Sequence, residues 1–160
     1  MPFDVTRAAA HVRRVVLEFN SERLKVHYNA GEKFRDYQTR TEKLEREFAD
    51  LQRKLQASEA TDSDEAYRAL MARMETTRRA LADNICTVIE SWDLEGDRDA
   101  IRGLMSKEDQ KRHKNEDGHG PIPVDGAWLD ALPLPDEFIL RIINKINEDF
   151  AQGGAAGKGR

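Results

Sequence analysis

Two runs of alternating apolar residues near the start of the chain constrain its fold most strongly. Every second position is apolar in both runs: Val15, Leu17 and Phe19 in the first, and Leu24, Val26 and Tyr28 in the second. This period of two is typical of strands that bury one face. A turn at 20–23 pairs Phe19 with Leu24, Leu17 with Val26 and Val15 with Tyr28. We therefore expect an antiparallel hairpin over 15–29, and because a lone hairpin is marginally stable, other elements must cover its apolar face.

After this hairpin the apolar spacing changes to three or four residues, which predicts two long helices. The first helix is expected over 32–57, with these apolar positions: Phe34, Tyr37, Leu44, Phe48, Leu51 and Leu55. The second is expected over 63–93, with these: Tyr67, Leu70, Met71, Met74, Leu81, Ile85, Val88, Ile89 and Trp92. The polar link between them is short, so we expect an antiparallel pair of helices that buries one apolar seam against the other.

The rest of the chain alternates between irregular and helical patterns. Charge, glycine and proline dominate 95–125, which predicts a flexible loop, followed by a short helix at 126–133. Pro135 suits the first turn of a further helix over 135–150. The tail at 153–160, rich in glycine and alanine, is expected to be disordered. We predict a single domain over 1–152, mainly α with a small β-hairpin (α+β).

Composition excludes several classes of partner. The 160 residues carry 26 Lys and Arg against 30 Asp and Glu, a net charge of -4, so no strong positive field is available for nucleic acid. The densest basic cluster, at 107–114, is cancelled by four nearby carboxylates. Neither an export signal nor a membrane-spanning run is evident. We expect a soluble protein that binds neither nucleic acid nor membrane.

The chemistry-bearing residues do not form a recognisable active site. The histidines at 11, 27, 113 and 119 lack ligand-like spacing, and Asp117 with His119 is the only pair that could start a metal site. Cys86 is the only cysteine, which excludes a disulfide within the chain, and its place beside an apolar seam suits a half-buried thiol. We therefore expect no enzymatic activity, cofactor or metal.

The apolar stripe near the C-terminus is the candidate for partner binding. Its aliphatic and aromatic residues exceed what one helix contact needs: Trp128, Leu132, Phe138, Ile139, Ile142, Ile143, Ile146 and Phe150. The alternative is that the stripe packs on the helical pair and belongs to the core. Trp92 and Trp128 flank the 95–125 segment and leave the same two alternatives open.

Four short phrases occur in one order along the chain: the hairpin at 15–31, Ile89-Glu90-Ser91-Trp92-Asp93-Leu94, Asp117-Gly118-His119-Gly120-Pro121-Ile122-Pro123-Val124, and Leu132-Pro133-Leu134-Pro135 before an isoleucine-rich helix. Together they resemble the tail assembly chaperones of long-tailed, siphovirus-type bacteriophages and prophages, notably those of actinobacterial hosts. The similarity spans roughly 15–150. The family usually passes almost directly from the Trp-Asp-Leu phrase to the Asp-Gly-Pro phrase, whereas here 95–116 intervene.

The resemblance implies a helper of virion morphogenesis in the host cytoplasm that is absent from the mature virion. Such chaperones bind the tape measure protein, keep it soluble and help recruit tail tube protein around it, and self-association is left open. Two other classes remain: a structural neck or tail-completion protein of the virion, and a small helical DNA-binding regulator. The charge balance argues against the regulator.

Overall fold

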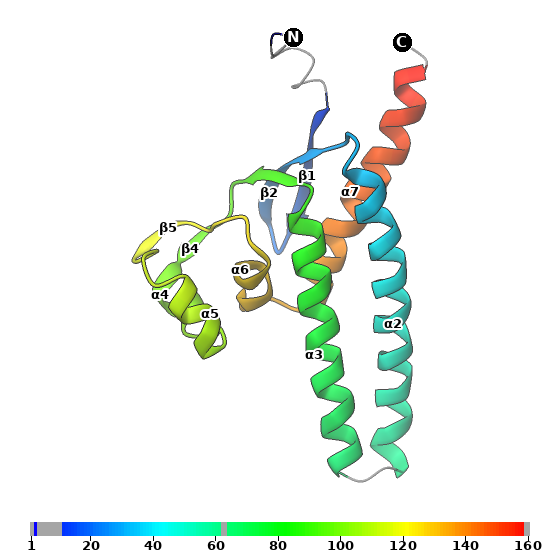
Figure 1. The fold of residues 1–160 in the computed structure, drawn as a ribbon, viewed down its shortest axis with the longest axis vertical. Coiled ribbons are helices and arrows are strands. Elements are labelled where there is room, and N and C mark those ends of the chain that lie inside the picture. The colour runs from blue at the N-terminus through cyan, green and yellow to red at the C-terminus, as the bar shows by residue number, and fades with distance from the viewer. Residues whose placement is uncertain (1, 3–10, 62–63, 159–160) are drawn as a thin grey trace.

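The structure, a computed structural model, describes the backbone of residues 2, 11–61 and 64–158 and the side chains of 2, 11–58 and 64–153 (Figure 1). In chain order the elements are β1 (Val12–Phe19), β2 (Glu22–Asn29), α2 (Phe34–Thr61), α3 (Asp64–Cys86), β3 (Ile89–Trp92), β4 (Glu95–Asp97), α4 (Arg98–Arg102), α5 (Lys107–Arg112), β5 (His119–Pro121), α6 (Gly126–Ala131) and α7 (Asp136–Lys158). The expected α+β class is confirmed. No helix of the described part is long and apolar enough to cross a membrane.

The predicted hairpin is present and buries the predicted face, but its register differs by two residues. Val15 pairs with Val26 and Leu17 pairs with Leu24, because the turn contains only Asn20 and Ser21. Both turn residues have positive φ, 50° and 69°, as in the mirror-image turns that match the twist of a tight hairpin. Since a shift of two residues preserves the alternation, the six apolar side chains remain buried on one face.

The second long helix ends earlier than predicted, and its expected last turns form a strand instead. α3 stops at Cys86, where the hydroxyl of Thr87 donates to the carbonyl of Asn84 at 2.6 Å. Ile89–Trp92 then pairs antiparallel with β2 as β3, which gives the sheet order β1-β2-β3. The apolar spacing at 85, 88, 89 and 92 fits a helix, but tertiary pairing with β2 decides the outcome.

The two long helices form the expected antiparallel pair, whose connected ends project away from the sheet (Figure 1). A buried polar contact fixes their alignment near the sheet. The Nδ2 atom of Asn84 on α3 donates to the carbonyl of Tyr37 at 3.0 Å and to the hydroxyl of Thr41 at 2.8 Å, both on α2. Because a buried amide is costly without partners, this contact favours one alignment of the seam.

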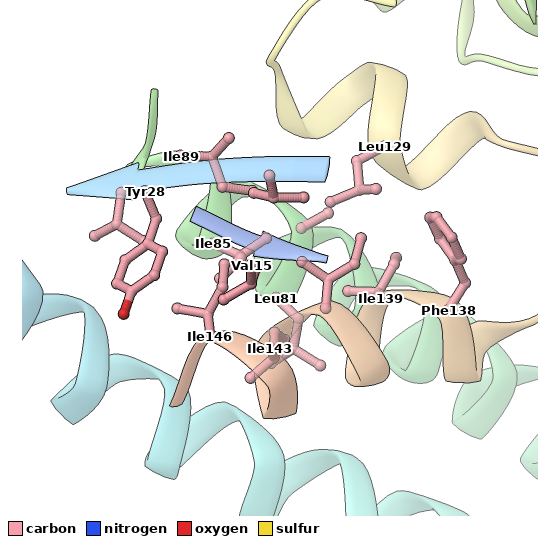
Figure 2. Packing of buried hydrophobic residues seen from close by; sticks show 14 of the residues in the cluster. Val15, Tyr28, Leu81, Ile85, Ile89, Leu129, Phe138, Ile139, Ile143 and Ile146 are labelled. Atoms are coloured by element: carbon pink, nitrogen blue, oxygen red, sulfur yellow. The ribbon is translucent and has the colours of Figure 1, made fainter. Parts of the chain in front are cut away.

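The main core lies between the inner face of the sheet and helices α3 and α7 (Figure 2). Ile85 of α3 and Ile143 of α7 are fully buried there, in one cluster with Val15 and Val26 of the sheet. Each such side chain contributes about 1.5–3 kcal/mol through burial, which explains how the marginal hairpin is held.

The segment 95–125, predicted to be a flexible loop, is an ordered lobe. Strands β4 and β5 pair antiparallel, and α4 and α5 lie between them in sequence. The guanidinium of Arg102 donates to the carbonyls of His113 and Glu116 at 3.2 and 2.7 Å and to the carboxylates of Asp99 and Asp117 at 2.7 and 2.8 Å. The Arg102 side chain therefore binds the irregular segment at four places. These contacts stabilise a segment whose sequence has no long apolar run.

The lobe has a small apolar cluster of its own, separate from the main core. It consists of Ile101, Met105, Ile122, Ala127 and Trp128, with Trp92, Leu94 and Leu132 shared between the two clusters. The indole Nε1 of Trp92 donates to the carbonyl of Ile122 at 2.6 Å. The short helix predicted at 126–133 is α6, which ends at Ala131.

Helix α7 continues past the predicted end at 150 and runs to Lys158. The disordered tail predicted for 153–160 is therefore wrong for 153–158, and 159–160 lie outside the described residues. Gly153 permits a close approach of β1, because a Cβ atom there would lie 2.1 Å from Nη1 of Arg13. Arg13 also donates to the carbonyl of Phe150 at 3.5 Å, so this side chain of β1 contacts α7 at 150 and 153.

Candidate partner-binding groove

The residues that could carry chemistry are engaged in structural contacts. Among the described residues, no group of three or more His, Cys, Asp or Glu is placed to hold a metal ion. Burial raises the pKa of the Cys86 thiol to about 12, with the nearby carboxylates of Asp125 and Asp83 adding to the shift, so the thiol is protonated at neutral pH. The Asp117 carboxylate, which with His119 was the one candidate metal pair, accepts from Arg102 within the lobe.

The stripe predicted to bind a partner is the protein's own core, so the expectation of an exposed stripe is wrong. Six of its eight residues are buried: Trp128, Phe138, Ile139, Ile142, Ile143 and Ile146. Leu132 and Phe150 are half-buried, and the ring of Phe150 stacks on Phe34 with centroids 4.0 Å apart. The alternative interpretation, that the stripe packs on the helical pair and the sheet, describes the structure.

Accessible apolar surface lies instead beside the lobe. Leu104, in the link between α4 and α5, is 62% exposed, the highest value among the large hydrophobic side chains of the described residues. It stands at a groove of about 480 Å³ between α3 and the lobe. The apolar lining comes from two helices and the link between α4 and α5: Ala72 of α3, Leu104 and Met105 of the link, and Ala127 and Ala131 of α6. We call this the lobe groove.

Small residues hold the walls of the lobe groove close together. A Cβ atom on Gly126, at the start of α6, would lie 1.8 Å from Oδ1 of Asp83 on α3, so only glycine allows this approach. The alanines of the lining leave room above them. The volume suits a few side chains from one face of a helix rather than a whole helix, whose diameter is about 10 Å.

Four ion pairs from two consecutive arginines of α3 fix the groove's polar sides. Arg78 contacts Asp130 and Asp136 at 2.9 Å each, and Arg79 contacts Asp83 at 3.0 Å and Asp109 at 2.7 Å. The side chain of Asp109 is only 8% exposed. The hydrogen bond from Arg79 is the largest of the effects that lower its pKa to about 2, so this carboxylate stays ionised at neutral pH. Three of these pairs join α3 to the lobe, to α6 and to the start of α7, while the Arg79–Asp83 pair lies within α3.

A second hollow of about 420 Å³ lies between the hairpin turn and the start of α7. Leu134, 38% exposed, lines it together with Phe19 and Phe138. Phe138 brings the first turn of the predicted stripe to the wall of this hollow. Glu22, Asp93 and Glu95 surround the apolar part, so the hollow disfavours an apolar partner segment that carries acidic residues.

Sequence reasoning missed the lobe groove, although part of its scaffold has a local signal. Ser106 begins α5 as its N-cap and accepts from the backbone N–H of Asp109 at 3.2 Å. A serine followed three residues later by an acidic residue is a recognised helix-start pattern. No local pattern, however, indicates that Arg79 of α3 reaches the same Asp109, because the pair is formed only by the tertiary fold.

No family model, no curated protein and no solved structure matches this chain.

Proposed function

We propose that the protein is a phage tail assembly chaperone that binds amphipathic helices of the tape measure protein in the lobe groove. In this role it keeps that long protein soluble in the host cytoplasm and helps to recruit tail tube subunits, and it is absent from the mature virion. The order of the sequence phrases described above supports the assignment to tail assembly. The exposed Leu104 at the lobe groove is the observation that carries the binding site.

The chemistry of the groove suits an amphipathic helix. Its apolar lining can accept two or three aliphatic side chains from one helix face, while Glu75 and Thr76 on the adjoining wall can face the polar flank. Met71, 39% exposed, lies four residues before Glu75 of the lining and so adds apolar surface on the same side of α3. A contact of this size is weak and reversible, which a chaperone later displaced by tube subunits requires.

The test is co-expression with the tape measure protein of the same phage, followed by measurement of how much of that protein stays soluble. We expect Leu104→Asp to weaken binding about tenfold or more, because it replaces the burial of a leucine with the desolvation of a charge. Leu134→Asp is the matched control, since it changes another exposed leucine that lies at the second hollow. Circular dichroism verifies that both variants fold. Equal solubilisation by Leu104→Asp and the unchanged chain would exclude the lobe groove.

A second measurement separates the chaperone from a structural neck or tail-completion protein. Mass spectrometry of purified virions is expected to detect tail tube protein and tape measure protein without this chain. If the chain is recovered in a fixed ratio to the tube protein, it is a virion component and the proposed chaperone role is wrong.

A further inference from the structure

β1 is an edge strand whose outer side has no partner strand within the described residues. The sheet order is β1-β2-β3, so β1 pairs with β2 on one side only. The pair that flanks a two-residue turn, here Phe19 with Glu22, is hydrogen-bonded. Because hydrogen-bonded pairs alternate along an antiparallel ladder, the odd-numbered residues of β1 direct their backbone N–H and C=O groups to β2. The bond from the N–H of Ala30 to the carbonyl of His11, at 2.6 Å, follows the same alternation. The even-numbered residues therefore direct their backbone N–H and C=O groups outward.

The side chains along this edge are self-complementary. Arg14 and Glu18 are exposed, with the half-buried Val16 midway between them. When two copies of β1 pair antiparallel about Val16, Val16 lies opposite Val16, and Arg14 of each copy lies opposite Glu18 of the other. Other registers also pair outward-directed residues with one another. A register centred on Arg14, for example, places Arg14 of one copy opposite Arg14 of the other, so like charges meet. Only the register centred on Val16 matches both opposite charges.

The helix layer beneath the edge has the same symmetry. α7 runs antiparallel to β1, since Phe138 contacts Phe19 with centroids 5.2 Å apart while the Arg13 guanidinium lies over the ring of Phe150. A groove of about 670 Å³ lies between the strand edge at 16–18 and the exposed flank of α7, which carries Arg141, Asn144, Lys145 and Glu148. Arg141, whose guanidinium lies 5.3 Å from the centroid of the Phe19 ring, is at one end of that flank and Glu148 is at the other, so a twofold axis at Val16 would bring flanks of opposite charge together.

We propose that β1 is a homodimer interface, in which two copies of this chain join their sheets edge to edge in the register centred on Val16. Arg14, Val16 and Glu18 of each copy then exchange backbone N–H and C=O groups with the other copy, which extends the sheet across the twofold axis. The complementary charges of the strand and of the α7 flank select a second copy over an unrelated extended segment. This interface lies apart from the lobe groove and is independent of what that groove binds.

Charge reversal tests the register directly in the intact chain. Arg14→Glu alone or Glu18→Arg alone places like charges opposite each other twice per dimer, so each variant should raise the dimer dissociation constant about tenfold or more. An equimolar mixture of the two variants restores both opposite-charge pairs and should dimerise like the unchanged chain. Sedimentation velocity measures all of these species, and Arg68→Glu, an exposed reversal on α3, is the control that should leave the dimer intact.

Amide hydrogen exchange supplies a second, residue-specific readout. The N–H groups of Arg14, Val16 and Glu18 should gain protection as protein concentration rises, while those of the odd-numbered neighbours are protected at every concentration. The proposal is overturned by a chain that stays monomeric at millimolar concentration, or by a variant mixture that fails to recover the dimer. It is also overturned if the three amides exchange freely within the dimer. Protection that does not depend on protein concentration would overturn it as well, because the edge is then covered within one copy.

Discussion

At the scale of single residues, the ion pair between Asp109 and Arg79 joins the lobe to the helical pair. Asp109 sits in the first turn of α5, accepts from Arg79 at 2.7 Å and also accepts from Arg112. Its carboxylate is therefore ionised in the folded protein down to a much lower pH than in the unfolded chain. A carboxyl pKa that is depressed on folding stabilises the folded state above the unfolded pKa of about 4, and this contribution is lost as the pH falls toward 2.

We predict that Asp109→Asn lowers the free energy of unfolding by about 2–3 kcal/mol at pH 7, because the carboxyl pKa falls from about 4 to about 2 on folding and each pKa unit corresponds to about 1.4 kcal/mol. The difference between the two proteins should shrink steadily below pH 4 and vanish near pH 2. Urea unfolding followed by circular dichroism at several pH values measures both quantities. A difference that stays constant from pH 7 to pH 2 would mean that Asp109 acts through packing rather than through its charge.

At the scale of elements, the hairpin turn sets the register on which the edge-strand proposal depends. Asn20 and Ser21 both adopt positive φ, a conformation that costs a residue with a side chain about 1 kcal/mol and glycine nothing. Ser21→Gly should therefore raise the free energy of unfolding by a few tenths to about 1 kcal/mol, despite the greater freedom of glycine in the unfolded chain. Thermal unfolding compares it with Glu22→Gly, which lies in a strand and should be destabilising. A stability gain from both substitutions would contradict the turn assignment.

The same elements show why some features could be predicted from the sequence and others could not. Strict alternation identifies the buried face of the hairpin, but turns of two and four residues bury the same face, so the register predicted from a turn at 20–23 was wrong by two residues although the buried face was right. The apolar spacing of 85–92 fits a helix, but the backbone N–H of Asn29 in β2 donates to the carbonyl of Val88 at 2.7 Å, and this pairing begins a strand instead. Such pairings lie far apart in the sequence and leave no local period.

The candidate site was harder to predict than the elements for a related reason. Apolar residues that repeat every three or four positions indicate a stripe, but they do not distinguish a stripe that faces solvent from one that faces the core. Ile142 and Ile146 are fully buried because α7 covers the apolar face of the hairpin. The sequence already indicated that some element must cover this face, since a lone hairpin is only marginally stable. The lobe groove draws on α3, α6 and the link that carries Leu104, which only the tertiary fold brings together.

At the scale of the whole molecule, two apolar clusters of unequal size meet at Trp92, Leu94 and Leu132. The larger one joins the sheet to α3 and α7, while the smaller one supports the lobe. Few apolar side chains hold the lobe, and Arg102 binds its backbone at the carbonyls of His113 and Glu116. Regions with few buried apolar contacts open with less free energy than the global unfolding transition. The lobe should therefore open before the rest of the molecule.

Paired cavity substitutions test this order of opening. Ile101→Ala removes a buried side chain from the small cluster and Ile143→Ala removes one from the main core, each at a cost of about 2–5 kcal/mol to the unit that contains it. We expect Ile101→Ala to abolish amide protection over 95–121 while β1 and β2 keep theirs. Ile143→Ala should lower protection throughout and reduce Tm by roughly 5–15 °C, given about 2–4 °C per kcal/mol for a chain of this size. If Ile101→Ala instead lowers protection equally in β2 and in the lobe, the two clusters unfold as one cooperative unit, and the lobe groove cannot open and close independently of the sheet.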